Sequence, residues 1–417
     1  MKKICLLFLV LCVLFTAMTS CRREQATGKT TVVFWNGYTG PDRPVLEQIV
    51  EDFNKSQNSI EIRMEISPWD TLFQRLMPAF IAGNAPDLIA MGADRVPEYA
   101  QANRLEPLDS FLANSTALNS SDLVQGLMDA AVFQGRRFGM PMAVAAMVMY
   151  YNRDMFREAG LNPDNPPRTM AELQNIWPRL IRRDAGGQVT QYAQAIAVRH
   201  TVPMIPVFMW MHGADVLVDG RSALNSPQML TAITLLANAF QQGVSPQGLT
   251  GQEADNLFAA GRAAIEFNGP WAINGFRNAG IDLGIAVVPD GPVTRKTWGG
   301  DSLMVMNRDS KVKEAVWTFM EYWNSRDIQR KWALEVGFPP SRTDMSNDTA
   351  LLSGNPDISF FLDSLPYIQI FLPGEPKANR INEEVLTPLF ESVFRGLQTP
   401  EAGLAVAHQR LNSLMAE

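Results

Sequence analysis

The chain has 417 residues and a formal net charge of −7, with 46% apolar and 19% charged residues. This is the composition of a globular protein with room for two or three domains, and a mildly acidic chain without a basic run argues against nucleic acid as a partner. His200, His212 and His408 are far apart in the sequence, which gives no metal-ligand spacing. We therefore expect neither a metal ion nor a cofactor.

The first 21 residues have the pattern of a bacterial secretion signal. Lys2 and Lys3 precede an apolar run over 4–15, which is too short to span a bilayer, and small residues then lead into Cys21. The ending M-T-S-C resembles a lipobox, in which the cysteine is acylated and becomes the mature N-terminus. The alternative is an ordinary cleaved signal peptide in which Cys21 has no role.

Cleavage before Cys21 predicts a signal peptide over 1–20 and leaves 397 of the 417 residues. It also removes the two other cysteines, so the mature chain is expected to form no internal disulfide. Residues 21–29 are polar and predict a lipidated tether. No second apolar stretch of about 18 residues follows, so we expect an extracytoplasmic body that is held at the membrane by lipid alone.

Strand and helix patterns alternate after the tether. Strands are predicted over 31–35, 60–66 and 87–91, where residues are β-rich or alternate between apolar and polar. Apolar residues at helical spacing predict helices over 45–53 and 72–80. This order predicts βαβ units and a mainly parallel sheet.

Large flat or soft side chains and polar groups follow each of the three predicted strands. In an open α/β sheet, ligands lie outside the carboxyl ends of the strands, so we expect these side chains at one edge. A single tryptophan is more often a core residue, but repetition at successive strand ends favours a binding site. The candidates are Trp35 and Tyr38 after the first strand, Trp69 and Asp70 after the second, and Met91, Asp94 and Arg95 after the third.

The middle of the chain has the pattern of a second α/β lobe, and the C-terminal part predicts further helices. Three segments rich in glycine or proline interrupt the pattern at 268–271 (N-G-P-W), 297–302 (T-W-G-G-D-S) and 338–342 (F-P-P-S-R). Strands are predicted over 147–151, 263–267, 285–288 and 303–306, and helices over 170–181, 203–211, 230–240 and 311–335.

The sequence contains no G-x-S-x-G, H-E-x-x-H or phosphate-loop pattern, so we expect no enzyme. Aromatic residues beside Gly, Asn, Asp or Arg recur instead. Such groups suit a neutral polyhydroxylated ligand, because ring faces pack against a sugar's C–H face and charged groups hydrogen-bond its hydroxyls. A phosphate would favour several basic residues or a glycine nest, and Gly299 with Gly300 leaves a phosphorylated ligand open.

Six segments recur in a known family: F-W-N-G-Y at 34–38, P-W-D-T-L-F-Q at 68–74, G-N-A-P-D-L-I at 83–89, M-Y-Y-N-R-D-M-F at 149–156, G-R-A-A-I-E-F-N-G-P-W at 261–271 and W-G-G-D-S-L-M-V at 298–305. With them the chain resembles the family-1 extracellular solute-binding proteins, the maltose-binding-like sugar receptors of ABC importers. The resemblance implies a periplasmic-binding-protein-like fold of two α/β lobes, joined by a multi-crossing hinge with the ligand cleft between them. It implies an N-terminal lobe of 30–142 and 291–342 and a C-terminal lobe of 143–290 and 343–417.

The resemblance also implies site residues. Trp271 matches a sugar-stacking tryptophan, and Asp94 and Arg95 match an acid and an arginine on the sugar, whereas Met91 replaces an aromatic residue. Ala143–Ala146 is the implied hinge; maltose-binding relatives carry a glutamate near Ala145, which implies a different ligand here. Pocket-facing segments of relatives add Trp35, Tyr38, Trp69, Asp70, Trp210, Trp298, Gly300 and Asp301, with the core as the alternative for Trp210 and Trp298 and a turn or cap role for Asp301.

Two further positions stay open at this point. Tyr150 and Tyr151 cannot both face the cleft if they lie on one strand, since successive side chains alternate. Arg342 either faces the cleft or pairs on the surface.

The predicted function is that of an extracytoplasmic receptor that binds a mono- or oligosaccharide, closes by hinge motion and delivers the sugar to an ABC permease. The expected partners are the sugar and the permease subunits, and a monomer is expected. The alternatives are a glycerol-3-phosphate-type binding protein, a secreted glycoside hydrolase, and a sugar sensor that docks on a chemoreceptor or kinase ectodomain.

Overall fold

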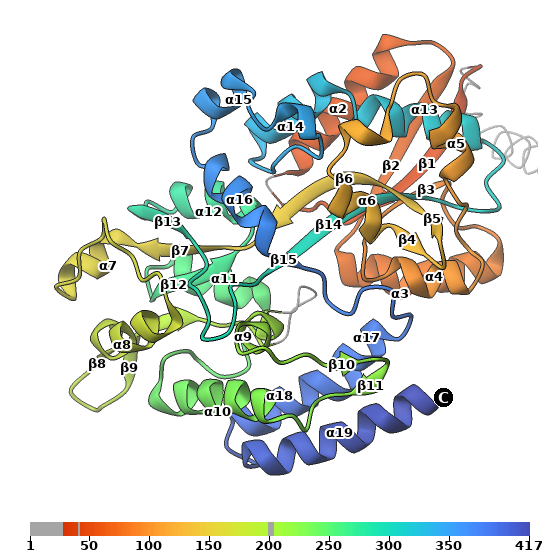
Figure 1. Cartoon of the computed structure of the whole chain (residues 1–417). Helices are drawn as coiled ribbons and strands as arrows, with labels where there is room; N and C mark the ends of the chain where they lie inside the picture. Colours follow the sequence, from red (N-terminus) through yellow and green to blue (C-terminus); the bar gives the residue numbers. More distant parts are fainter. Residues whose placement is uncertain (1–27, 41, 199–203) are drawn as a thin grey trace, which may run out of the picture.

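The computed structural model describes residues 28–40, 42–198 and 204–417, without the side chain of Asp301. The predicted signal peptide, Cys21 and most of the predicted tether lie outside the described residues. The described part is an α/β protein of two lobes, each built on its own large sheet (Figure 1). None of the helices in this part is both long and apolar enough to cross a membrane.

The first sheet begins with two βαβ units. Its members are β1 (Thr30–Asn36), β2 (Ile60–Ile66), β3 (Leu88–Gly92), β6 (Gly139–Ala146), β14 (Thr297–Met306) and β15 (Ile368–Gln369), with α2 (Arg43–Ser56) and α3 (Trp69–Ala82) as connections. β1 lies between β2 and β3 and is parallel to both. The carboxyl ends of these three strands therefore meet at one edge, as the sequence predicts. β14 is antiparallel to β3 and to β6.

Local sequence explains these elements. α2 buries Leu46, Ile49, Val50 and Phe53, which recur every three or four residues and form one apolar stripe. α3 ends at Gly83, whose positive φ of 72° is the left-handed conformation that glycine adopts without strain. These helices cover the sheet but do not cover the carboxyl ends of its strands.

The second sheet has the order β13–β7–β12–β9–β8, with β12 antiparallel to β7 and parallel to β9. A 3-10 turn, η2 (Pro270–Ala272), follows β12 and leads into α12 (Ile273–Asn278). The strands are β7 (Val148–Asn152), β8 (Arg182–Arg183), β9 (Val189–Ala195), β12 (Ala263–Asn268) and β13 (Leu283–Val287), and α8 (Met170–Leu180) and α11 (Gly251–Ala259) pack on them.

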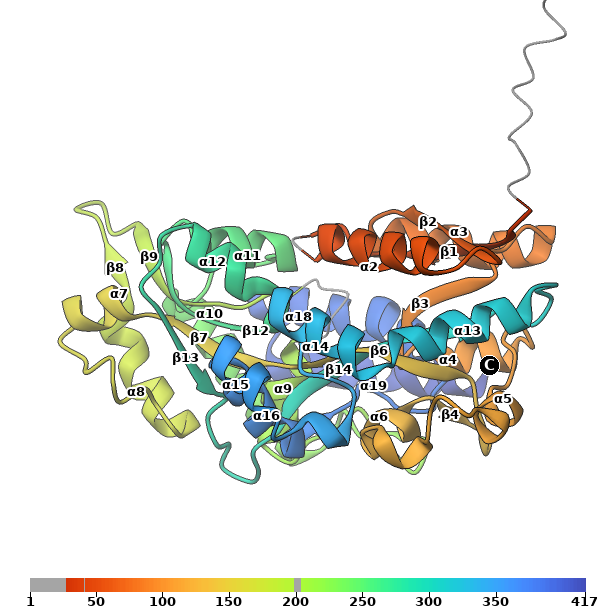
Figure 2. The same ribbon diagram turned by 90° about the horizontal axis from the view of Figure 1, so that it is seen from above.

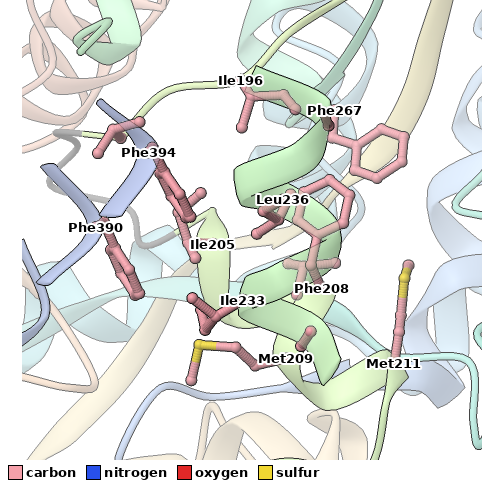
Figure 3. Packing of buried hydrophobic residues seen from close by; sticks show 14 of the residues in the cluster. Ile196, Ile205, Phe208, Met209, Met211, Ile233, Leu236, Phe267, Phe390 and Phe394 are labelled. Atoms are coloured by element: carbon pink, nitrogen blue, oxygen red, sulfur yellow. The ribbon is translucent and has the colours of Figure 1, made fainter. Parts of the chain in front are cut away.

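The C-terminal helices return to the second lobe and complete its core (Figure 3). Phe208 stacks on Phe267 with ring centroids 5.6 Å apart, and Phe240 stacks on Phe394 at 4.7 Å. Residues distant in sequence thus share one apolar cluster. The helices involved are α9 (Ile205–Met211), α10 (Pro227–Gln242), α18 (Thr387–Phe394) and α19 (Pro400–Ala416).

Shorter elements complete the fold. Two small hairpins are formed by β4 (Val132–Phe133) with β5 (Arg136–Arg137) and by β10 (Leu217–Val218) with β11 (Arg221–Ser222). The remaining helices and turns are α4 (Val96–Gln101), α5 (Asp109–Asn114), η1 (Ser120–Asp122), α6 (Gln125–Ala130), α7 (Arg153–Glu158), α13 (Lys313–Trp323), α14 (Arg326–Glu335), η3 (Thr343–Met345), α15 (Thr349–Gly354), α16 (Ile358–Ser364), η4 (Leu365–Tyr367), α17 (Ala378–Ile381) and η5 (Asn382–Leu386).

Two predicted elements are wrong in detail. The helix expected over 311–335 is two helices, α13 and α14, because the chain breaks at Asn324, whose side chain bonds back to the Met320 carbonyl (3.0 Å). The segment 297–302, expected to precede a strand, is itself part of β14. Gly299 and Gly300 are paired there with β6, so they do not form the anion-binding nest that the sequence left open.

Candidate functional site

A cavity of about 610 Å³ lies between the two lobes, which is within the usual size of a small-molecule site. The first lobe lines it with the segments that follow β1, β2 and β3. The second lobe lines it with α11, η2 and α12. Residues of β6 and β14 lie between them, and Figure 2 shows α2 and α3 on one side of the molecule with α11 and α12 on the other.

Three tryptophans line the cavity, and each one packs across a glycine. The ring lies where the Cβ atom of any other residue would be, so only glycine permits the observed position. The pairs, with the distance from an added Cβ to the nearest ring atom, are Trp69 with Gly37 (2.0 Å), Trp271 with Gly269 (2.2 Å) and Trp298 with Gly300 (1.6 Å).

We expect Gly300→Ala to displace the Trp298 ring, because both groups cannot occupy the same space. Overpacking of this kind typically costs about 1–3 kcal/mol, and loss of the ring from the wall should weaken ligand binding by roughly tenfold. Chemical denaturation and titration calorimetry measure the two effects. Gly126→Ala is the matched control, because nothing lies within 4 Å of its added Cβ. Equal ligand affinity in the two variants would contradict this role for Gly300.

Aromatic contacts extend the first-lobe wall. Trp69 stacks on Phe73 with centroids 5.9 Å apart, and Tyr38 meets the edge of Trp69 at 5.4 Å. The Arg95 guanidinium lies 3.9 Å from the centroid of Phe73, a cation–π contact that fixes its position. Trp271 of the second lobe reaches Phe338, which follows α14, at 6.1 Å. Flat apolar surface therefore faces the cavity from both lobes.

Three carboxyl groups line the same cavity, Asp42, Asp94 and Asp255. Asp42 is 8% exposed, its Oδ1 has no hydrogen-bond partner among the described residues, and burial raises its pKa to about 6. Burial also raises the pKa of Asp94, partly opposed by the charge of Arg95, and the pKa of Asp255. Arg95 is the one basic side chain in the described part of the lining. The cavity is therefore acidic as well as aromatic.

Comparison with known proteins assigns the chain to a family. Residues 39–330 match the family model of the bacterial extracellular solute-binding proteins. The chain belongs to this family. A solute-binding protein from Thermotoga lettingae, solved with alpha-D-tagatose bound, is 25% identical, superposes with a TM-score of 0.83, and aligns over 93% of this chain and all of that one.

Two curated relatives of this solute-binding protein have names that state a ligand. A maltotriose-binding protein of Pyrococcus abyssi is 23% identical and aligns over 86% of this chain and 76% of its own length. An sn-glycerol-3-phosphate-binding periplasmic protein of Salmonella typhimurium is also 23% identical, over 94% of each chain.

The structure of this solute-binding protein brings many of the predicted site residues together and places others elsewhere. Trp35, Asp70, Met91 and Trp210 are not among the described residues that line the cavity. Asp301 lies on β14 opposite Val144. The predicted residues that do line the cavity are Tyr38, Trp69, Asp94, Arg95, Trp271, Trp298 and Gly300.

Each of the other candidates has a structural position. Trp35 and Met91 still lie within their strands and are buried in the cluster between the sheet and α3. Trp210 is 3% exposed in the core of the second lobe, where it bonds to Asp215. Asp70 is exposed in the first turn of α3, where a negative charge favours the helix dipole.

Tyr150 and Tyr151 point to opposite faces of their strand, as alternation predicts, and both are buried in core clusters. The Tyr150 hydroxyl donates to the Gly269 carbonyl (2.8 Å) and the Tyr151 hydroxyl to the Pro163 carbonyl (2.7 Å). Arg342 is also buried rather than in the cavity wall. It donates to Asp344 Oδ1 (2.9 Å) and Asp122 Oδ2 (3.2 Å), which ties two loops together.

Several lining residues are not among the candidates predicted from the sequence. Phe73 follows Trp69 by four positions on α3, a spacing that places both on one helix face and that was available in the sequence. Asp42 and Phe338 carried no such signal. The polar residues of α11 resembled an ordinary solvent-facing helix surface, and only the tertiary structure shows that Asp255 faces the cavity.

Thr250 begins α11 with a capping box. Its hydroxyl accepts from the Glu253 N–H (3.3 Å), and the Glu253 carboxylate accepts from the Thr250 N–H (2.8 Å). We expect Thr250→Ala to lower the free energy of unfolding by about 1 kcal/mol and to loosen this wall of the site. Urea denaturation measures the effect. Thr116→Ala, on an exposed loop, is the control, and equal losses in both variants would count against the cap.

Proposed function

We propose that this solute-binding protein is the carbohydrate receptor of an ABC importer. The observation that carries the proposal is the lining of the inter-lobe cavity, which combines three tryptophan rings with three carboxyl groups. Ring faces pack against the C–H face of a sugar, and each buried hydroxyl needs a hydrogen-bond partner that carboxylates supply. A purely apolar or a purely charged ligand would leave one of these two sets unused.

The relatives support a carbohydrate as the ligand class. The Thermotoga lettingae protein was solved with alpha-D-tagatose, and the Pyrococcus abyssi relative is a maltotriose-binding protein. The two ligands differ in size, so the relatives support a mono- or oligosaccharide and leave the particular sugar to experiment.

Glycerol-3-phosphate is the second candidate, because the Salmonella typhimurium relative carries that ligand in its name. The charge of the cavity argues against it here. Asp42, Asp94 and Asp255 would face the phosphate, and Arg95 is the one basic group of the described lining that could offset its charge. Gly299 and Gly300, the candidate phosphate nest, are part of a strand.

Closure of the cavity requires relative motion of the lobes. The chain passes between them at Met147 and again where it enters β14, and the two crossings bond to each other. The Met147 N–H donates to the Trp298 carbonyl (3.1 Å), and Thr297 Oγ1 donates to the Met147 carbonyl (2.9 Å). We assign 30–142 and 291–342 to one lobe and 143–290 and 343–417 to the other, and we place Ala143–Ala146 and β15 in the hinge, because both segments pair with β14 of the first sheet. A ligand that touches both lobes would favour the closed form and present it to the permease.

Attachment of the receptor to the membrane would depend on Cys21. An acylated Cys21 would hold the body near its permease through a short tether, which raises the effective concentration of the receptor there. We expect Cys21→Ser to move the mature protein from the membrane fraction to the soluble fraction. Immunoblots of both fractions test this, and an unchanged distribution would contradict the lipid anchor.

A thermal-shift screen followed by titration calorimetry tests the proposed function. D-Tagatose, mannobiose, maltotriose and glycerol-3-phosphate cover the ligand classes, since a ligand that binds the native state alone raises its stability. A response to at least one sugar is expected. A response to the phosphate ester alone would overturn the carbohydrate assignment, and chromatographic detection of cleaved maltotriose would favour a glycoside hydrolase.

A further inference from the structure

One face of α11 forms a polar part of the cavity wall. Gln252, Asp255, Asn256 and Ala259 all line the cavity, and positions three or four apart lie on one side of a helix. Asp255 is the ionisable group on this face. Its carboxylate is therefore the strongest hydrogen-bond acceptor that α11 turns toward the cavity.

The Asn268 side chain of β12 joins Asp255 to Glu266. The Asn268 amide donates to Asp255 Oδ1 (2.8 Å) and to Glu266 Oε1 (3.1 Å), and Asn268 Oδ1 accepts from the Gly269 N–H (2.8 Å). The Asn268 amide therefore bridges the carboxyl groups of Asp255 and Glu266. Two carboxyl groups that share one donor in a buried site favour a state in which one of them carries a proton, because like charges repel there.

Glu266 is the group that carries this proton. It lies within the otherwise apolar part of β12 and is 3% exposed, and no donor of the described residues reaches its buried Oε2. Burial, reinforced by the neighbouring Asp255 charge, raises the pKa of Glu266 well above its ordinary value. An ionised carboxylate at this depth would be costly, so the neutral form is the stable one near neutral pH.

Asp255 and Glu266 together connect the interior of the second lobe to the wall of the cavity. A buried polar group usually adds little stability relative to an apolar side chain of the same size, so its presence here calls for another role. A neutral Glu266 would direct its proton toward Asp255 and, through the Asn268 amide that bonds to both groups, would keep the Asp255 carboxylate ionised and oriented. With Oδ1 engaged by Asn268, the remaining lone pairs of Asp255 can accept from a ligand in the cavity.

We propose that Asp255 is a specificity-determining residue that accepts a hydrogen bond from a ligand hydroxyl, with Glu266 and Asn268 as the positioning residues that fix its carboxylate. The inference rests on the proposed function and deepens it. The part of the ligand that faces α11 must carry a donor group such as a sugar hydroxyl. A carboxylate or phosphate oxygen at that place would meet the Asp255 charge and be rejected.

Titration of Glu266 gives a signature that a merely structural residue would not give. The ionisable groups around it are Asp255 on α11, Tyr150 opposite it on β7, and more distantly Arg277 and Asp357, which act on Tyr150. Loss of the Glu266 proton would leave two negatively charged carboxylates, Glu266 and Asp255, close together, and they would repel each other. Because the folded state holds this proton more tightly than the unfolded chain, stability should fall as the pH rises through the raised pKa.

The binding test compares Asp255→Asn and Asp363→Asn with the wild-type chain. Asp363 is exposed on α16, which makes it the matched control. Titration calorimetry uses whichever of D-tagatose, mannobiose and maltotriose binds the wild type most tightly. We expect Asp255→Asn to lose about tenfold or more in affinity and Asp363→Asn to lose none. Unchanged affinity in Asp255→Asn overturns the inference but leaves the receptor function standing; no heat from any sugar with the wild type overturns both.

The positioning role is tested with Glu266→Gln and Glu266→Leu. Glutamine is neutral and still donates to Asp255, so its affinity at pH 7.5 should stay within about twofold of the wild type, whereas leucine, which lacks a donor, should lose roughly fivefold or more. Melting temperatures of the ligand-free proteins from pH 6 to pH 10 provide the second readout. Glu266→Gln should lack part of the alkaline decline of the wild type. Identical profiles for the two proteins would contradict the inference that Glu266 carries a proton in the folded state.

Discussion

Replacing Trp271 with alanine is expected to weaken carbohydrate binding by roughly a hundredfold, the size typical of a tryptophan at the centre of a binding site. Trp271 lies in the cavity lining on the second lobe, its ring packs across Gly269, and it lies 6.1 Å from the ring of Phe338, tilted by 36°. The ring would therefore contact the ligand and also the surface that approaches on closure. Titration calorimetry with the sugar found in the screen gives the change in affinity.

The same variant should change the ligand-free protein little, because the Trp271 ring is only partly buried. Trp210→Ala is the contrasting control: Trp210 is 3% exposed in the second-lobe core, and its loss should lower the free energy of unfolding by about 3–5 kcal/mol. Denaturation of both ligand-free variants separates the two roles. If Trp271→Ala loses as much stability as Trp210→Ala, Trp271 belongs to the core and the assignment of the ring to the site fails.

The strand ends show how well the location of the site can be predicted from the sequence. Parallel strands joined by helices put their carboxyl ends at one edge, so the segments after 36, 66 and 92 could be assigned to the cavity without coordinates. Tyr38, Trp69 and Arg95 follow this logic and line the cavity. The rule acts on segments, because it depends on the direction of the chain and not on the orientation of any one side chain.

Single residues near a strand end are harder to assign. Trp35 and Met91 lie one residue before the end of their strands, and their side chains face the layer beneath α3. Whether a residue is the last in a strand or the first beyond it decides which way it points, and hydrophobic pattern does not locate that boundary to one residue. The residues of the second-lobe wall were harder still to predict, since the face of α11 that carries Asp255 becomes part of a cavity only in the tertiary structure.

Replacing Asp42 with asparagine is expected to stabilise the ligand-free protein at pH 7.5 while weakening sugar binding. Burial raises the pKa of Asp42 from 3.8 to about 6, so the folded state binds this proton more tightly than the unfolded chain does. Its contribution to stability is complete below the unfolded value and is lost as the pH rises through the folded one. At pH 7.5 the ionised carboxylate costs up to about 3 kcal/mol, which a neutral amide avoids.

The cost of Asp42 is reasonable only if a ligand recovers it. Asp42 lines the cavity and its buried Oδ1 has no partner among the described residues, so we expect a sugar hydroxyl to make a charge-assisted bond with this carboxyl group, and its loss should weaken binding by about tenfold. Denaturation at pH 4 and pH 7.5 gives the stability change, with Asp363→Asn as the control. A variant that gains stability at pH 7.5 but binds sugar as tightly as the wild type would show that the destabilising Asp42 carboxylate has a role other than ligand binding. A variant that keeps the pH dependence of the wild type would show that the Asp42 carboxylate carries no such cost.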